Sequence, residues 1–281
     1  MTVSEVTISS WPEICGYNRP GWLYRGQQEA TWALKTSLER CFDRSCVKSE
    51  DRPSIEKLLI REFERTYHHY GRYVPSAASK IEWLSLMQHH GAPTRLLDFT
   101  YSIYVAAYFA LESAEKPCAV WAINSKWLVS RAITSLKKAG KQDADVFDED
   151  TETSKELRYY SLLFEGIPVR CLVPVSAYRL NERIRMQKGL FLAPGDIRTC
   201  CQENLLALPG SQDKRNVVKL VLPPAVRLRA LNDLYYMNIS RTNLFPGLDG
   251  FSSSLAVFHH SFMSASDTSH MPPVSNSGKR K

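Results

Sequence analysis

The chain has 281 residues, of which 44% are apolar and 23% are charged, and its formal net charge is +7. This composition can build a sizeable core, so it excludes an intrinsically disordered protein. No run reaches the ~18 uncharged apolar residues of a membrane-spanning helix, and the N-terminus lacks a basic start followed by an apolar core. We therefore expect a cytosolic, cytoplasmic protein without a membrane partner.

Apolar residues at helical spacing predict four helices in the first half of the chain, at residues 37–42, 54–70, 79–90 and 102–114. Ser54 and Ser102 are the expected N-caps of two of them, and Gly91 is the expected stop of a third. Before the first helix, the alternation of Trp22, Tyr24 and Gly26 predicts a short strand that ends at a glycine turn.

The second half is richer in predicted strands, at residues 118–124, 167–175, 184–194 and 217–224. Helices are expected at 126–140 and 225–238. Residues 141–156 are acidic and lack periodicity, which predicts an exposed loop or lid. We predict an α+β fold, with one domain over residues 1–260 that contains an N-terminal helical insertion, and a disordered basic tail at 261–281.

Cysteine and histidine usage gives no metal signature. The seven cysteines contain no Cys-x-x-Cys pair, which favours reduced thiols in a chain without an export signal. Three histidine doublets occur, but consecutive side chains point in different directions and rarely ligate one metal ion. We expect no metal. The moderate positive charge fits an anionic partner, either a nucleotide or a nucleic acid.

The segment MQHHGAPTRLLDFTYS, residues 87–102, concentrates hydrogen-bonding side chains just before a predicted buried helix. Arg95 and Asp98 are three residues apart, so they could form an ion pair that braces the loop. An ionised Asp98 that faced a cleft would suit a cationic transition state, whereas one that faced inward would be a structural strut. His89 and His90 could contact a ligand or simply interact with the C-terminus of a helix.

Four blocks of this sequence resemble the FRG domain family: YRGQ at 24–27, QHHGAPTRLLDFTYSIYVAAYFA at 88–110, NERIRMQKGLF at 181–191 and TNLFPGLDG at 242–250. The order of the blocks is also similar to that of ADP-ribosyltransferases of the Arg-Ser-Glu type. That second resemblance implies an ADP-ribosyltransferase-like mixed or antiparallel β core. It also implies NAD as the substrate.

The transferase resemblance assigns roles to particular residues. Arg25 would hold NAD, and Asp98, Thr100 and Ser102 stand where these enzymes have a Ser-Thr-Ser run. Gln187 and Gly189 replace the usual Glu-x-Glu, so Asp98 is our candidate for the missing negative charge. The predicted catalytic residues are Asp98, Gln187 and His90. The predicted NAD-binding residues are Tyr24, Arg25, Gly26, Gln27, Gln88, His89, Thr94, Arg95, Thr100 and Ser102.

The resemblance further implies transfer of ADP-ribose to a macromolecular acceptor such as RNA or DNA, a toxin or phage-defence role, and a protein antitoxin or regulator. Two alternatives stay open, namely a non-catalytic nucleotide- or RNA-binding module, which the missing Glu favours, and a metal-independent nuclease. Under the first interpretation, Arg25, Asp98 and Gln187 should converge on one cleft.

Overall fold

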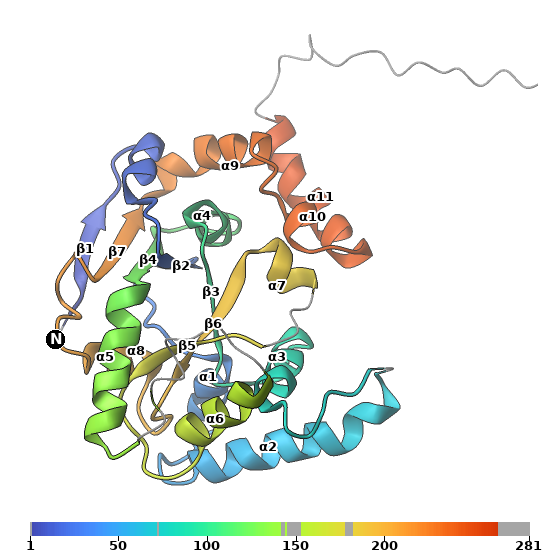
Figure 1. Cartoon of the computed structure of the whole chain (residues 1–281). Helices are drawn as coiled ribbons and strands as arrows, with labels where there is room; N and C mark the ends of the chain where they lie inside the picture. The colour runs from blue at the N-terminus through green and yellow to red at the C-terminus, as the bar shows by residue number, and fades with distance from the viewer. Residues whose placement is uncertain (1, 72, 142–143, 145–152, 178–181, 264–281) are drawn as a thin grey trace, which may run out of the picture.

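The computed structural model describes residues 2–71, 73–141, 144, 153–177 and 182–263 (Figure 1). Seven strands form one mixed sheet in the order β1-β7-β4-β2-β3-β6-β5. Their bounds are Ser4–Thr7 (β1), Trp22–Gln27 (β2), Leu97–Thr100 (β3), Cys118–Asn124 (β4), Leu172–Val175 (β5), Gly189–Pro194 (β6) and Val217–Leu222 (β7). β1 runs parallel to β7, and the other neighbouring pairs are antiparallel.

Helices cover both faces of the sheet (Figure 1). Their bounds are Ser37–Arg44 (α1), Arg52–Thr66 (α2), Lys80–His89 (α3), Ile103–Leu111 (α4), Ser125–Lys138 (α5), Thr153–Phe164 (α6), Glu182–Met186 (α7), Cys201–Leu206 (α8), Arg227–Tyr236 (α9), Arg241–Leu244 (α10) and Leu248–Met263 (α11). Short 3₁₀ helices are Trp11–Tyr17 (η1), Tyr67–His69 (η2) and Pro224–Val226 (η4).

The sheet separates two apolar cores because side chains alternate between its faces. In β2, Trp22 and Tyr24 pack into the core beneath α4 and α9, whereas Leu23 belongs to the core beneath the helices on the other face. β4 does the same with Val120 on the α4 side and Trp121 opposite. Helices α1, α2 and α3 lie between β2 and β3 in the chain, where the sequence predicts the helical insertion.

Several predicted elements are confirmed. β4 has the predicted bounds, and α3 differs by one residue at each end. α4 begins directly after Ser102, whose hydroxyl accepts a hydrogen bond from the Val105 N–H at 3.3 Å. These elements are locally encoded, by a cap residue or by flanking proline, so sequence pattern alone locates them.

Other predictions are wrong. α2 begins at Arg52 with Asp51 as N-cap, so Ser54 lies inside the first turn, which tolerates Pro53. The predicted strand at 184–194 is helical up to Met186, and Lys188, with φ of 47°, turns the chain before β6. Of the predicted strand at 167–175, only the part from Leu172 onward is a strand, namely β5.

The predicted loop at 141–156 falls mostly outside the described residues, but its last four residues belong to α6. The predicted tail is likewise outside them from residue 264, and residues 261–263 continue α11. Besides helices α10 and α11, which were not predicted, the sequence pattern missed the short strand β1 and the short helix α8. Both are at most six residues long, and neither shows enough apolar repeats to reveal a period.

Candidate functional site

A cavity of about 770 Å³ opens at the middle of the sheet, and its volume lies within the range of small-molecule sites. It is bounded by β2, the segment that leads from β2 to α1, β3, α4 and the end of α7. The lining residues are Tyr24, Arg25, Gly26, Gln27, Gln28, Thr31, Trp32, Ala33, Lys35, Arg40, Asp98, Phe99, Thr100, Ala106, Phe109, Arg183 and Gln187. Arg25, Asp98 and Gln187 therefore converge on one cavity, as predicted.

The cavity forms where two neighbouring strands diverge. β2 pairs with β4 at six positions but with β3 at only one, Tyr24 with Thr100. Beyond that pair, the Arg25 side chain replaces the strand ladder, because its Nη1 donates a hydrogen bond to the Asp98 carbonyl at 2.7 Å. The guanidinium thus spans the opening between the strands and forms part of the cavity wall.

Arg25 is a partly buried cation that forms no ion pair with a carboxylate among the described residues. Its Nε is shielded from solvent and has no hydrogen-bond partner there. Burial lowers the pKa of Arg25, and the negative charge of Asp98 opposes that shift. Because an unpaired buried charge is costly, an anionic ligand that reached this guanidinium would recover free energy. This arrangement favours anion binding.

Further cations line the same cavity and were not predicted. Lys35, Arg40 and Arg183 join Arg25 there, and Asp98 is the only carboxylate among the lining residues. Lys35 forms an ion pair with Asp43 at 2.7 Å, and the Arg183 guanidinium lies 4.6 Å from the centre of the Phe245 ring. Lys35 follows the YRGQ motif closely in the sequence. The turn into α1 decides where its side chain points, so the sequence spacing could not predict that it lines the cavity.

Asp98 is held by a side chain from the polar block. Gln88 donates from Nε2 to the Asp98 Oδ2 at 3.0 Å and to the Leu96 carbonyl at 3.3 Å, and its Oε1 accepts a hydrogen bond from the Thr94 hydroxyl. The Asp98 residue itself is exposed. Gln88 and Thr94 do not line the cavity. They were predicted to bind NAD, but their observed contacts orient Asp98 and the loop before β3.

Thr100 joins β3 to the end of α7. Its hydroxyl donates to the Gln187 carbonyl at 2.7 Å and accepts from the Ser102 N–H at 3.0 Å. Gln187 in turn donates from its side chain to the Leu244 carbonyl at 3.0 Å. Thr100 and Gln187 line the cavity, whereas Ser102 caps α4 and does not.

Three residues of the YRGQ motif have structural contacts that the prediction did not include. The Tyr24 side chain is fully buried, and its hydroxyl donates to the Tyr17 carbonyl at 2.7 Å. The Gln27 amide accepts from the Trp121 indole and donates to a backbone carbonyl. A Cβ at Gly26 would lie 2.0 Å from the Ala106 carbonyl oxygen. Gly26 therefore allows α4 to pack closely on β2, and it also lines the cavity.

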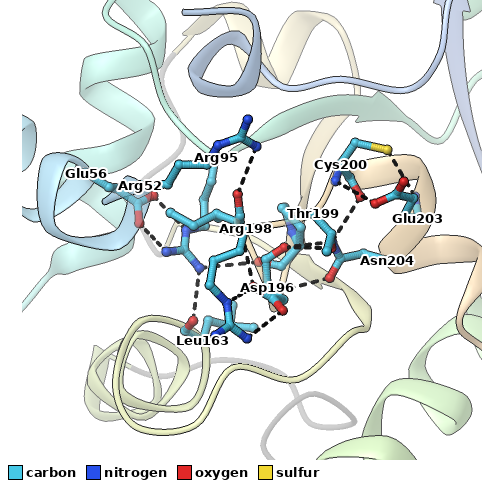
Figure 2. A network of polar contacts seen from close by, with 12 residues as sticks. Arg52, Glu56, Arg95, Leu163, Asp196, Arg198, Thr199, Cys200, Glu203 and Asn204 are labelled. Atoms are coloured by element: carbon cyan, nitrogen blue, oxygen red, sulfur yellow. Dashed lines mark hydrogen bonds and ion pairs between the residues drawn. The ribbon is translucent and has the colours of Figure 1, made fainter. Parts of the chain in front are cut away.

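Arg95 is not at the cavity, which corrects its predicted role. Its guanidinium is buried and forms a two-pronged ion pair with Glu56 of α2 (Figure 2). Nη1 also donates to the Leu163 carbonyl at 2.9 Å and to the Pro194 carbonyl at 3.3 Å. Arg95 therefore does not brace Asp98. It connects α2, α6 and the end of β6, and it anchors the chain just before β3.

The two predicted histidines lie at the C-terminal end of α3. Both residues are exposed, and neither lines the cavity. The His90 ring is 6.3 Å from the Tyr67 ring, and His89 and His90 are 5.0 Å apart in an edge-to-face arrangement. The structure therefore does not support His90 as a group that acts inside the cavity, and the helix-end interpretation fits its position.

Glu39 is a buried carboxyl on α1, next to Arg40 of the cavity wall. Its Oε2 accepts a hydrogen bond from the Thr36 N–H at 2.9 Å in a capping box, and its Oε1 has no partner among the described residues. Burial raises the pKa of Glu39 to about 7, against the effect of hydrogen bonds from the Thr36 and Cys201 backbones. Nearby Arg52 lowers this pKa and Asp43 raises it.

We expect stability to fall as the pH rises through the range over which Glu39 ionises. Because the folded pKa lies above the ordinary value of 4.5, the contribution of protonated Glu39 is complete below about pH 4.5 and lost by about pH 7. The loss should be about 3 kcal/mol. Urea unfolding from pH 4.5 to 8 measures it, with Glu39→Gln as the control that keeps an acceptor but cannot ionise. An identical pH profile in both proteins would contradict the assignment.

Comparison with known proteins agrees with the motif blocks. Residues 20–118 match the family model of the FRG domain. This segment is similar to the FRG domain. The FRG domain match includes β2, the helical insertion, β3 and α4, and hence most of the cavity wall, whereas Arg183 and Gln187 lie beyond it. No curated protein and no solved structure matches the chain, so the similarity to ADP-ribosyltransferases gains no support from these comparisons.

Two features are absent from the described ranges of the chain. None of the helices in these ranges is both long and apolar enough to cross a lipid bilayer. Over the same ranges, no three side chains among histidine, cysteine, aspartate and glutamate gather as a metal ion would require.

Proposed function

We propose that the cavity binds NAD and that the protein transfers the ADP-ribose group to a macromolecular acceptor. The observation that carries the proposal is Arg25, a partly buried guanidinium that forms no ion pair with another described residue, in a wall shared with three further cations. A diphosphate would supply the missing negative charge. A guanidinium matches phosphate oxygens with two parallel hydrogen bonds, which a lysine cannot form.

The reaction would need few groups. The bond between the ribose C1′ and the nicotinamide nitrogen breaks, and nicotinamide leaves with the electron pair. Positive charge develops on the ribose, and an acceptor oxygen or nitrogen then bonds to C1′ and releases its proton to water. Asp98 would stabilise the positive charge, since it is the carboxylate among the lining residues, and Gln88 would hold it in place.

The acceptor is proposed from charge alone. A net charge of +7 would attract RNA or DNA through phosphate contacts rather than base recognition. The toxin or phage-defence role and the antitoxin partner stay predictions that rest on the resemblance.

A binding module without turnover is the second candidate. The observation that favours it is Gln187, which stands where a glutamate is expected and whose side-chain amide is engaged by the Leu244 carbonyl. A neutral amide can orient a ribose but adds no compensating charge. In this candidate the same cations bind the nucleotide, and nicotinamide is not released.

Arg25→Ala should abolish NAD binding at micromolar concentrations, with a melting temperature close to that of the wild type. The buried charge costs free energy when it is unpaired, so its removal should not unfold the protein. Arg25→Lys should rescue binding poorly because the fork is lost. Calorimetric titration with NAD measures binding, and release of labelled nicotinamide measures turnover.

The matched control is Arg44→Ala, which removes the same charge from an exposed position at the end of α1. It should bind NAD like the wild type. If Arg25→Ala unfolds the protein or leaves NAD binding unchanged, Arg25 is a structural strut and the proposed function is wrong. If NAD binds the wild type but no nicotinamide appears, the binding module is the correct function.

A further inference from the structure

Trp32, one of the residues that line the cavity, is unusually exposed for a tryptophan of this chain. Trp32 is 49% exposed, whereas the other five tryptophans of the chain are at most 9% exposed. A tryptophan offers the largest apolar area of any side chain, and folding normally buries most of it. Trp32 lines the cavity instead. Small-molecule sites are concave and are lined largely by apolar and aromatic side chains, so an exposed indole inside a cavity suits a ligand contact.

The backbone around Trp32 is held firmly, so its exposure does not reflect a loose loop. The Ala30 N–H donates to the Pro117 carbonyl at 2.8 Å, and the Gln27 side chain donates to the Ala33 carbonyl at 3.1 Å. The Leu34 N–H and carbonyl both bond to Gln202, each at 3.1 Å. Anchors on both sides of Trp32 therefore present its indole from a fixed segment.

Two cationic residues, Lys35 and Arg40, follow Trp32 in the sequence and line the same cavity. Lys35 lies three residues further along, and the Arg40 guanidinium donates to the Lys35 carbonyl at 2.7 Å, which joins α1 to the Trp32 segment. A nucleotide combines the two features that this part of the wall would recognise, a planar aromatic ring and a phosphate group. An aromatic peptide side chain would use the indole but would bring no negative charge to these cations.

We propose that Trp32 is the base-stacking residue of the site, so that its ligands are nucleotides with a diphosphate. The inference rests on the proposed function, because it takes the cationic cavity as the phosphate site. Stacking of a base on an aromatic side chain tolerates any base, since every base has a π face. Trp32 thus contributes affinity for the nucleoside half of the ligand and orients it relative to Arg25.

The test compares inorganic pyrophosphate with ADP on the full chain. Binding is measured by calorimetry, and stacking is measured by tryptophan fluorescence, in which Trp32 is the solvent-exposed emitter. ADP should quench the emission and protect it from iodide, whereas pyrophosphate should bind without quenching it by contact. Trp32→Ala should weaken ADP binding about ten- to hundredfold and leave pyrophosphate binding unchanged. Trp32→Phe should retain most of the ADP affinity.

The control variant is Tyr236→Ala, which removes an aromatic ring that is 84% exposed and outside the cavity lining. It should bind both ligands like the wild type. If pyrophosphate binds but Trp32→Ala leaves ADP affinity unchanged, the stacking inference is overturned and the cationic site stands. If neither pyrophosphate nor ADP binds the wild type, the proposed function fails and the inference falls with it.

Discussion

Arg95→Ala should lower the free energy of unfolding by about 3–5 kcal/mol, the cost typical of breaking a buried ion pair. Its side chain and that of Glu56 are each only 4% exposed, so the substitution leaves the Glu56 carboxylate buried without its cation. It also removes the donor to the Leu163 and Pro194 carbonyls, and it exposes a face of the Phe164 ring, whose centre lies 3.7 Å from the guanidinium.

Urea unfolding followed by circular dichroism measures this loss. Arg61→Ala is the matched control because its ion pair with Glu62 is exposed, and it should cost less than about 1 kcal/mol. The double variant Arg95→Met with Glu56→Leu should recover much of the stability, since an apolar pair replaces both charges. A loss below about 1 kcal/mol for Arg95→Ala would contradict the role that we assign to this contact.

The Arg95 contacts also determine where Asp98 lies. Arg95 stands three residues before Asp98, and its contacts fix the start of β3 against α2, α6 and β6. Asp98 therefore reaches the cavity from β3, and the Arg95 contacts hold the segment just before this strand in place. We therefore expect any functional loss in Arg95 variants to follow their loss of folded protein.

Asp98→Asn should slow nicotinamide release by about 10²–10³-fold while the melting temperature stays close to that of the wild type. Asparagine keeps the size of the side chain and an oxygen that can accept from Gln88, but it removes the charge that would stabilise a cationic ribose. Since Arg95 pairs with Glu56 and not with Asp98, the substitution breaks no buried ion pair. Rate and stability effects can thus be separated.

Single-turnover release of labelled nicotinamide measures the rate, and ADP titration verifies that the cavity still binds. Gln187→Ala is measured in parallel and should change the rate far less, because its side chain carries no charge and bonds to the Leu244 carbonyl. Near-normal turnover in Asp98→Asn would overturn the catalytic assignment. A rate loss in Gln187→Ala equal to that in Asp98→Asn would move the assignment to the end of α7.

Features encoded by neighbouring residues were predictable from the sequence. The cap at Ser102, the proline-bounded strand β4 and the helix α3 depend on a few adjacent positions, and the structure confirms them. The convergence of Arg25, Asp98 and Gln187 was also predicted, but only because the order of the motif blocks resembles known families. Composition and periodicity alone would not have brought these three residues together.

Only the tertiary structure decided which charges are paired. Sequence proximity favours an ion pair between Arg95 and Asp98, yet the partner of Arg95 is Glu56, which is 39 residues away. Arg25, in contrast, forms no ion pair with a carboxylate among the described residues, and its Nε has no hydrogen-bond partner there. The path of the chain sets these pairings, because α2 packs beside the segment that precedes β3 and so brings Glu56 to Arg95. The cations from α1 and α7, and the exposed indole of Trp32, reach the cavity for the same reason.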